Sequence, residues 1–341
     1  MSNDLNKRSV LISILNWNTA EKTIECVHAL RALDKSVFVQ IRIIIIDNGS
    51  SPSDYDTLQK GLRGGSEIIH REKVNLGFAG GHNIAIRKSL VDQDDFIWLV
   101  NSDAIVATSD VLTVLIAEME ANPSCGAVSP LITDFHDEKR IDFSGAIHDW
   151  VARQSIRLSI SACERAQEDA AENVWVIGTA VLFRLAAIRI VGVLNERMFA
   201  YYEDDEIGAR LSAQGWSSRV AFGAKVMHAE FRQETDRPSY YFYLMQRNSL
   251  IFWYEQMPGR QDLKLYVSLI DQAFYETNKL YFRGYTRQAD AALLGIRDFV
   301  CRQYGEYKSQ RKISIFLRLV QKLIFFQQRR VIERTLNLSN E

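Results

Sequence analysis

The sequence predicts an α/β protein with a mostly parallel central sheet and a helical C-terminal extension. In the first hundred residues, short apolar runs alternate with segments whose apolar residues recur at helical spacing. This alternation is typical of parallel strands joined by crossover helices. Beyond residue 238, helical periodicity dominates to the end of the chain. We therefore expect an α/β domain over residues 1–235 and a helical region over residues 236–341.

Four apolar runs are expected to form the first strands of the sheet. They cover residues 10–16, 41–46, 67–70 and 96–100. Three of them end in polar clusters, namely Asn16-Trp17-Asn18, Asp47-Asn48 and Asn101-Ser102-Asp103. Ligands of parallel α/β sheets bind beyond the carboxyl ends of the strands. The sequence therefore predicts a site where these three clusters meet.

Helices are expected between these strands, and a looser pattern follows them. The expected helices cover residues 19–33, 55–62 and 83–90. Further strands are predicted at residues 127–132, 141–147, 174–183 and 219–227, with helices at 184–191 and 205–213. No repeat or low-complexity linker interrupts this order.

Composition narrows the class of protein. Of the 341 residues, 47% are hydrophobic and 24% are charged, which is ordinary for a globular protein. A formal net charge of -1 argues against a nucleic-acid-binding protein, which usually has a basic excess. The four cysteines lie far apart without a CxxC pair, so neither a zinc site nor a disulfide framework is predicted. A cytoplasmic setting is expected, and since no run of about 18 apolar residues occurs, any membrane contact is expected to be peripheral.

Two acidic motifs are candidates for chemistry. Asp103, after the strand at 96–100, can bind Mg²⁺ or Mn²⁺, and the metal would neutralise a diphosphate leaving group; a plain turn that caps the next helix is the alternative. Four acids at residues 203–206 open a helix. They favour the helix dipole, but their crowding also raises the pKa of at least one carboxyl toward the range of a general base.

A glycine-rich block and a histidine complete the candidates. Residues 75–83 (NLGFAGGHN) open a helix, where glycines allow close backbone approach and free amides can bind an anion. The block lacks the GxGxxG spacing, so a dinucleotide fingerprint is a poor match. His228 ends the last predicted strand, and a single histidine there is more often a packing residue than a ligand.

In their order along the chain, these motifs resemble the GT-A-fold glycosyltransferases of family 2, most closely the rhamnosyltransferase-like bacterial branch. The resemblance covers about residues 10–255. Its blocks are SILNWNT, IIIIDNGS, NLGFAGGHNIAIR, FIWLVNSDAIV, the run from VIGTAVLFR to YYEDDEIGARLSAQGW, VMHAEF and YYFYLMQRNSLIF.

The resemblance implies roles for individual residues. The catalytic base is matched by Asp204, with Glu203 beside it. The nucleobase is contacted by Asp47. The remaining nucleotide-sugar-binding positions are Leu15, Asn16, Trp17, Asn75, Gly77, Asn83, Ser102, Asp103, Gly178 and Thr179. Metal ligands are matched by Asp103, the last acid of an Asp-x-Asp motif, and by His228, with Mg²⁺ or Mn²⁺ as the cofactor. Asn101 replaces the first acid of that motif, which leaves one carboxylate fewer for the cation.

The implied function is an inverting, metal-dependent transfer of a hexose from a nucleotide-diphosphate sugar to a hydroxyl of a cell-surface glycan or lipid-linked glycan, as in O-antigen biosynthesis. Similarity favours dTDP-rhamnose as the donor, with other UDP- or dTDP-sugars open. A non-catalytic nucleotide-sugar-binding or glycan-binding module is the alternative from another class. A nucleotidyltransferase is disfavoured because the loop at residues 16–19 has neither glycine nor a basic residue.

The C-terminal region leaves two interpretations open. Residues 308–334 combine apolar residues at helical spacing with many basic residues. Such a helix packs on its own domain or on a partner subunit in a homodimer. Alternatively, it docks on anionic lipid at the inner face of the plasma membrane, which would suit a lipid-linked acceptor. The aromatic-rich residues 240–254 either border the acceptor site or pack in the core.

Overall fold

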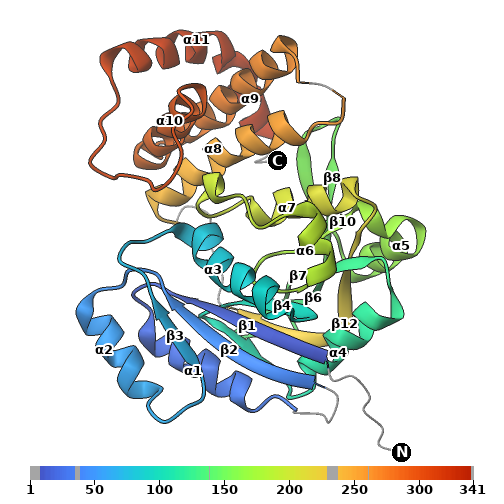
Figure 1. Cartoon of the computed structure of the whole chain (residues 1–341). Coiled ribbons are helices and arrows are strands. Elements are labelled where there is room, and N and C mark those ends of the chain that lie inside the picture. Colours follow the sequence, from blue (N-terminus) through green and yellow to red (C-terminus); the bar gives the residue numbers. More distant parts are fainter. Residues whose placement is uncertain (1–7, 35–38, 138, 229–236, 260, 339–341) are drawn as a thin grey trace, which may run out of the picture. The chain divides into compact units, whose positions relative to one another are not determined.

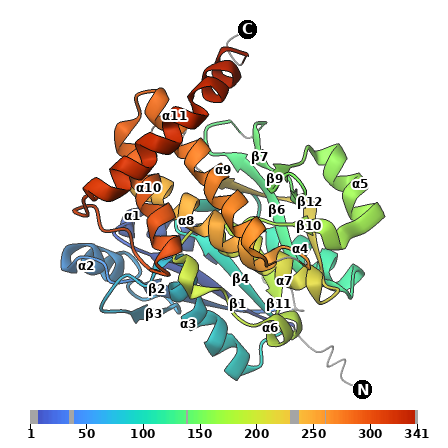
Figure 2. The ribbon, with the colours of Figure 1, turned by 90° about the horizontal axis from the view of Figure 1, so that it is seen from above.

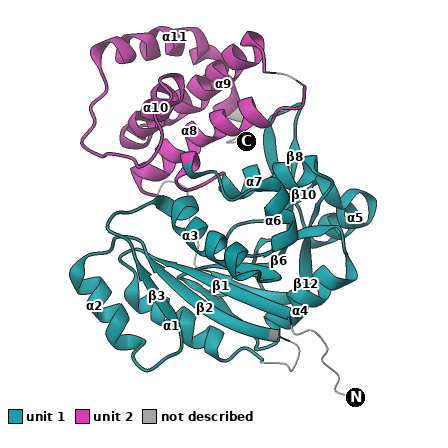
Figure 3. Ribbon diagram, in the orientation of Figure 1, with its two compact units in different colours: residues 1–196, 203–230 teal, residues 197–202, 231–341 magenta. Residues whose placement is uncertain are grey.

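A computed structural model describes residues 8–34, 39–137, 139–228, 237–259 and 261–338 (Figure 1). The chain divides into two compact units (Figure 3). Unit 1 comprises Met1–Glu196 and Glu203–Glu230, and unit 2 comprises Arg197–Tyr202 and Phe231–Glu341. The boundary predicted after residue 235 lies outside the described residues, so it stays a prediction.

Unit 1 is built on a mixed, mostly parallel sheet with the strand order β3-β2-β1-β4-β11-β6-β12-β5. The strands are β1 (Arg8–Asn16), β2 (Val39–Asp47), β3 (Ile68–Arg71), β4 (Phe96–Asn101), β5 (Ala104–Val106), β6 (Cys125–Asp134), β11 (Ala180–Arg184) and β12 (Ser217–His228). The first four strands are parallel neighbours, as are β6 and β12, whereas β11 runs antiparallel between β4 and β6. The predicted α/β class is confirmed.

Helices cover the sheet of unit 1 (Figure 1). They are α1 (Ala20–Arg31), α2 (Pro52–Gly61), α3 (Gly77–Asp92), α4 (Val111–Ala121), α5 (Ile160–Ala170), α6 (Leu185–Val191) and α7 (Glu203–Ala213). Helix α3 begins six residues before the prediction of residue 83, because its glycines belong to the helix. A Cβ at Gly81 would lie 2.2 Å from Leu15 Cδ1, so glycine here permits close packing of α3 on β1.

Two predicted strands, at residues 141–147 and 174–183, are each broken in two. The first breaks at Gly145, whose φ is +106°, into β7 (Ile141–Phe143) and β8 (Ala146–Asp149). The second breaks into β10 (Val174–Trp175) and β11. β7 and β11 join the large sheet, while β8 and β10 form a small sheet with β9 (Gln154–Arg157). An unbroken apolar run could not indicate this change of sheet, which leaves residues 176–179 as a loop.

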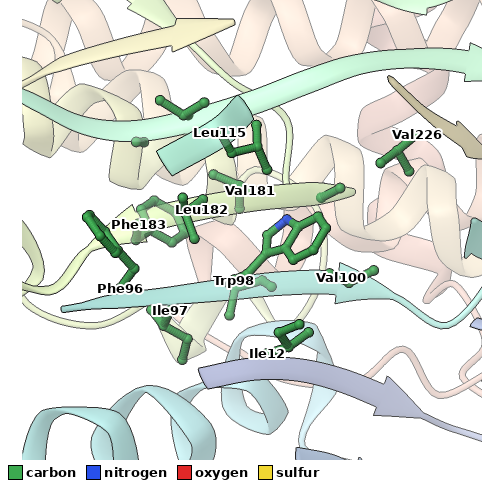
Figure 4. Close-up of a cluster of buried hydrophobic side chains, with 14 of the residues drawn as sticks. Ile12, Phe96, Ile97, Trp98, Val100, Leu115, Val181, Leu182, Phe183 and Val226 are labelled. Atoms are coloured by element: carbon green, nitrogen blue, oxygen red, sulfur yellow. The ribbon is translucent and has the colours of Figure 1, made fainter. Parts of the chain in front are cut away.

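The core of unit 1 fixes the strands that carry the site (Figure 4). Trp98 of β4 is fully buried among Ile12 of β1, Leu182 of β11, Leu115 of α4 and Val226 of β12. Each of these side chains is at most 1% exposed. Because the cluster joins four strands and a helix, the position of the polar residues after β4 depends on it.

The described part of unit 2 contains the helices α8 (Ser239–Gln256), α9 (Leu263–Phe282), α10 (Thr286–Val300) and α11 (Ile315–Leu338) (Figure 2). Helix α10 packs on α8 so closely that a Cβ at Gly295 would lie 2.6 Å from the carbonyl oxygen of Tyr243. Helix α11 packs on α9. Within the described residues, none of the helices is both long and apolar enough to cross a membrane.

Candidate active site

The ends of β1 and β2 form a polar corner. Asn16 Nδ2 lies within hydrogen-bond distance of three oxygens, 2.9 Å from Asp47 Oδ1, 3.1 Å from Ser50 Oγ and 2.9 Å from Asp54 Oδ2. Asp47 is fully buried, and its Oδ2 lies 3.3 Å from Arg71 Nε but receives no hydrogen bond from any described residue. Asn16 therefore orients Asp47, and one oxygen of Asp47 keeps acceptor capacity.

Trp17 and Leu15, the neighbours of Asn16 in the chain, differ in their exposure to solvent. Trp17 is 44% exposed, whereas Leu15 is partly buried against the apolar core. Of the residues predicted to shape a nucleobase pocket at the end of β1, Trp17 is the one that offers an aromatic ring to a solute. Leu15 packs against the apolar core, and Asn16 is hydrogen-bonded to Asp47.

The start of α3 is fastened to the end of β2. The Asn48 amide donates to Asn75 Oδ1 at 2.9 Å and to the Gly77 carbonyl at 3.0 Å, and its own oxygen accepts the Leu76 N–H at 3.0 Å. Asn75 Oδ1 also accepts the Gly77 N–H at 2.8 Å. The predicted Asn75 and Gly77 are thus held beside the Asp47 corner.

Asn83 lies deeper in α3 and is fully engaged by protein groups. Its amide donates to the Leu194 carbonyl at 2.9 Å and to Glu196 Oε1 at 2.9 Å, and its oxygen accepts the Leu194 N–H at 3.0 Å. The side chain is fully buried. Asn83 therefore joins α3 to the segment that precedes α7, while its predicted nucleotide contact stays a prediction.

The turn after β4 meets the end of β12. Strand β12 pairs with β5 so that His228 lies opposite Ala104, and His228 Nε2 lies 3.2 Å from Asp103 Oδ1. Lys22 Nζ lies 3.7 Å from Asp103 Oδ2. Burial works to raise the pKa of Asp103, but the hydrogen bond and charge of His228 and the charge of Lys22 outweigh it, so the pKa of Asp103 is lowered. Asp103 is therefore anionic at neutral pH.

The residues around Asp103 fit a cation only in part. Asn101 Nδ2 lies 3.4 Å from His228 Nε2, and Ser102 Oγ lies 3.2 Å from Thr19 Oγ1. The described part of the chain contains no group of three or more His, Cys, Asp or Glu side chains placed to hold a metal ion. Asp103, in the turn between β4 and β5, and His228, at the end of β12, make two adjacent candidate ligands. Two protein ligands suit Mg²⁺, which takes further oxygens from water and phosphate.

The four acids at the start of α7 have different environments. Glu203, Asp205 and Glu206 are 5%, 7% and 4% exposed, whereas Asp204 keeps partial access to solvent. Asp205 Oδ1 lies 3.0 Å from His148 Nε2 and accepts the Ser155 hydroxyl at 2.6 Å. The Glu206 carboxylate pairs with the Arg210 guanidinium at 2.7 Å. Asp204 is therefore the acid of this cluster that a substrate can reach, because its neighbours are covered by protein.

Asp204 is held by backbone groups and has a raised pKa. Its Oδ2 accepts the Gly178 N–H at 3.0 Å and its Oδ1 accepts the Asp205 N–H at 3.0 Å. Burial and the charge of Asp205 nevertheless raise the pKa of Asp204 to about 7. Burial and the charge of Asp204 raise the pKa of Glu203 well above its ordinary value. The neutral form of Glu203 is therefore favoured, while Asp204 can both take up and release a proton near pH 7.

The loop between β10 and β11 connects these regions. A Cβ at Gly178 would lie 3.4 Å from the Phe78 ring of α3 and 3.7 Å from Asp204 Cβ of α7. The next residue, Thr179, accepts the Asn101 N–H at 2.9 Å through its carbonyl oxygen. Two successive residues thus join the start of α3, the candidate base and the Asp103 turn within unit 1.

The match to a known family agrees with this arrangement. The family described as Glycosyl transferase family 2 matches residues 9–178, which include the Asp47 corner, the glycine-rich block, Asp103 and Gly178. The chain belongs to glycosyl transferase family 2. Its α/β architecture is the GT-A fold.

Curated relatives within this family are distant. The galactofuranosyltransferase GlfT1 of Mycobacterium tuberculosis is 24% identical over 208 residues, which are 60% of this chain and 66% of that protein. The N-acetylglucosaminyl-diphospho-decaprenol L-rhamnosyltransferase of the same organism is 31% identical over 85 residues, 25% of this chain and 28% of that protein. The chain therefore matches slightly less than two thirds of the length of the first relative.

Two solved structures share the fold. The mannosyltransferase PcManGT from Pyrobaculum calidifontis, in complex with GDP-Man and Mn²⁺, aligns with a TM-score of 0.55 at 11% identity, over 88% of this chain and 89% of that chain. GalNAc-T7 with UDP, GalNAc and Mn²⁺ aligns with a TM-score of 0.56 at 14% identity, over 81% of this chain and 51% of that chain. At these identities the likeness concerns the fold alone.

Sequence analysis did not single out two residues of this family 2 chain that hold the segment before α7. Arg247 and Asn248 are fully buried in α8, and both belong to unit 2 together with Arg197–Tyr202. Asn248 Nδ2 lies 2.7, 2.9 and 2.8 Å from the carbonyl oxygens of Met198, Ala200 and Tyr201. Arg247 Nη2 donates to the Met198 carbonyl at 2.9 Å. The two side chains therefore fasten this segment to α8.

The fastened segment has an unusual backbone. Phe199, Tyr201 and Tyr202 have φ values of +65°, +69° and +71°, a region that costs a side-chain-bearing residue about 1–2 kcal/mol. Glu203 follows Tyr202 directly, so the strained turn leads into the acids of α7. The pair Arg247-Asn248 within the otherwise apolar and aromatic run of α8 was the signal that could have revealed this role.

Proposed function

We propose that this chain is an inverting glycosyltransferase in which Asp204 is the catalytic base. The observation that carries the proposal is Asp204 itself, a partly accessible carboxyl with a pKa of about 7 beside the Gly178 loop. Such a pKa suits a general base at neutral pH. The acceptor hydroxyl gives its proton to Asp204, and its oxygen attacks the anomeric carbon. The bond from that carbon to the diphosphate oxygen breaks on the opposite face, and the nucleoside diphosphate leaves.

The donor is expected to lie over the ends of β1, β2 and β4. Asp47 Oδ2, which receives no hydrogen bond from a described residue, can accept one from the nucleobase, and the exposed Trp17 can contact its ring. Asn75 and Gly77 border the sugar nucleotide at the start of α3, while Gly178 and Thr179 lie between donor and acceptor. Each of these roles is a proposal drawn from the position of the residue in the fold.

The proposed donor sugar is rhamnose from dTDP-rhamnose. The named rhamnosyltransferase is the more identical of the relatives given above, though over a short segment. A galactofuranosyl donor is the second candidate, because the named galactofuranosyltransferase matches a much longer part of the chain. The proposed acceptor is a hydroxyl of a cell-surface glycan or lipid-linked glycan, and a diphospho-decaprenol acceptor appears in the name of the rhamnosyltransferase.

A divalent cation, Mg²⁺ or Mn²⁺, is proposed as the cofactor, with Asp103 and His228 as its protein ligands. When bound, it would neutralise charge on the departing diphosphate. The protein supplies further positive charge there through Lys22, whose Nζ lies 3.7 Å from Asp103. Both solved structures named above contain Mn²⁺, which supports the proposal.

A panel of nucleotide sugars tests the proposed function. The purified chain is incubated with each donor and Mg²⁺ or Mn²⁺, and release of nucleoside diphosphate is measured with and without glycan acceptors. Acceptor-dependent release that is lost in Asp204→Asn supports transfer. Binding of a donor by calorimetry without any product would instead indicate the non-catalytic module.

A further inference from the structure

Helix α11 exposes a row of large apolar side chains. Ile315, Phe316, Leu319, Leu323 and Phe326 are 82%, 76%, 55%, 68% and 82% exposed. With 3.6 residues per turn, these five positions fall within roughly 100° of the helix circumference. We call these five residues the outer face of α11. A contiguous apolar surface of this kind marks an interaction site, because soluble proteins scatter their exposed apolar residues.

The opposite side of α11 already supplies its packing. Ile332 and Gln321 are 0% and 5% exposed. Gln321 Nε2 donates to Asn278 Oδ1 of α9 at 2.8 Å, and Asn278 Nδ2 donates to Gln328 Oε1 at 2.9 Å. An amphipathic helix with one face docked normally turns a polar face to solvent. The outer face therefore has no role in holding α11 on unit 2.

Basic residues surround the outer face. Residues 308–338 contain eight Lys and Arg residues against one acid, Glu333. Arg311, Arg318 and Arg329 form ion pairs within the protein. The other five are exposed and form no ion pair within the described residues, namely Lys308, Lys312, Lys322, Arg330 and Arg334. The surface thus combines exposed apolar side chains with uncompensated positive charge.

We propose that the outer face of α11 docks on the surface of an anionic lipid bilayer. Apolar side chains such as Phe316 and Phe326 would enter the boundary between headgroups and acyl chains, while Lys322 and Arg330 would contact lipid phosphates. A second copy of the chain fits less well, because pairing two such faces would bring their basic rims together. The docking itself does not require sugar transfer; only its use in reaching a lipid-linked acceptor rests on the proposed function.

Co-sedimentation of the full chain with vesicles tests this proposal. We expect the chain to sediment with vesicles that contain phosphatidylglycerol, to stay in solution with pure phosphatidylcholine, and to be released by salt. Phe316→Ser combined with Phe326→Ser should abolish sedimentation. Lys322→Gln combined with Arg330→Gln should weaken it, by roughly fivefold for each charge removed.

The matched control is Val91→Ser, since Val91 on α3 is 78% exposed but lies in unit 1. It should sediment like the wild type. Equal sedimentation of the Phe316/Phe326 variant and the wild type, or no sedimentation with anionic vesicles, would overturn the proposal. A wild-type dimer that these variants convert to a monomer in light scattering, without vesicle binding, would assign the face to self-association and also overturn it.

The result is independent of the proposed function, because sedimentation needs no donor. Donor turnover in solution should be unchanged in all these variants. Vesicle binding by a chain that transfers no sugar would remove the proposed function and leave the docking intact. Sugar transfer by a chain that binds no vesicles would support the proposed function and overturn the docking.

Discussion

Helices α7 and α11 depart from ordinary burial in opposite directions. Helix α7 buries Glu203, Asp205 and Glu206, whereas α11 leaves Phe316 and Phe326 76% and 82% exposed. Charged residues are rarely buried without partners, and large apolar residues are rarely gathered on the surface. In α7 the protein itself supplies partners for two of these acids, since His148 and Ser155 meet Asp205 and Arg210 pairs with Glu206. The third, Glu203, has a raised pKa that favours its neutral form. In α11 no described residue covers the outer face, and the proposed docking on a bilayer would cover it.

Under the two proposals above, the two helices serve different steps. The acids of α7 surround a reactive group and set its pKa, so changes there should affect the chemistry. The outer face of α11 faces solvent, so changes there should affect only where the protein resides. The predictions below separate these two outcomes, from the largest expected effect to the smallest.

Replacing the proposed base should have the largest effect. Asp204→Asn should reduce turnover by about 10²–10⁴-fold because the proton acceptor is lost, while calorimetry should show donor binding close to that of the wild type. The variant should also be at least as stable above pH 7. The folded pKa of about 7 exceeds the ordinary 3.8, so the folded wild type binds more protons between these values and loses stability as the pH rises through them. Near-normal turnover of this variant would show that Asp204 is not the catalytic base.

Removing the candidate metal ligand should act on binding. Asp103→Ala should weaken nucleotide-sugar affinity measured with Mg²⁺ or Mn²⁺ by roughly 10–100-fold, the effect typical of lost metal contacts. Affinity measured with a chelator should change much less. An equal loss in both conditions would mean that Asp103 contacts the nucleotide without a cation.

A change that loosens the segment before α7, Arg197–Tyr202, should lower turnover. Asn248→Ala removes the amide that lies near three carbonyl oxygens of Arg197–Tyr202, and should lower the free energy of unfolding by about 1–3 kcal/mol. We expect kcat to fall by roughly tenfold with little change in the Kd of the donor, because the strained turn leads directly to Glu203 and Asp204. The control is Ser249→Ala on the same helix, whose hydroxyl donates to the Gln246 carbonyl within α8. A purely structural role would lower the amount of active protein and leave kcat per active site unchanged.

The pH dependence of the wild type should show the titration of Asp204. Because the base must be ionised, kcat/KM should rise with pH through about 7 and fall roughly tenfold per unit below it. The charge of Asp205 contributes to the raised pKa of Asp204, so Asp205→Asn should move this limb to lower pH. A profile unmoved by Asp205→Asn would show that burial alone sets the pKa of Asp204.

The smallest effect is expected on the stability contributed by the outer face of α11. Phe326→Ser should change the free energy of unfolding by no more than about 0.5 kcal/mol, because the side chain is 82% exposed. Ile332→Ala, on the packed face of the same helix, should cost about 2–5 kcal/mol. Chemical denaturation of both variants checks the contrast. A large loss in Phe326→Ser would mean that this side chain has a partner within the folded protein.

Much of the fold was predictable because the spacing of apolar residues along the chain indicates which side chains are buried. The apolar runs that became β1, β2 and β4 were located to within two residues, and their polar ends did meet at one edge of the sheet. The prediction of one strand over residues 174–183 was wrong because VWVIGTAVLF is largely apolar, and Gly178 and Thr179 alone do not indicate a change of sheet. Helices α4 and α5 were not predicted, so the region after residue 103 was the least well anticipated.

The sequence by itself determined the ordered polar clusters, the four acids of α7 and the basic amphipathic character of the C-terminal region. Only the tertiary structure decided that Gly178 donates to Asp204, that Arg247 and Asn248 hold the turn before it, and which side of α11 is left uncovered. Periodicity reports which side chains favour burial, because that preference is a property of each residue. Hydrogen bonds between distant residues and the choice of covered face depend on where the elements dock, which local pattern does not encode.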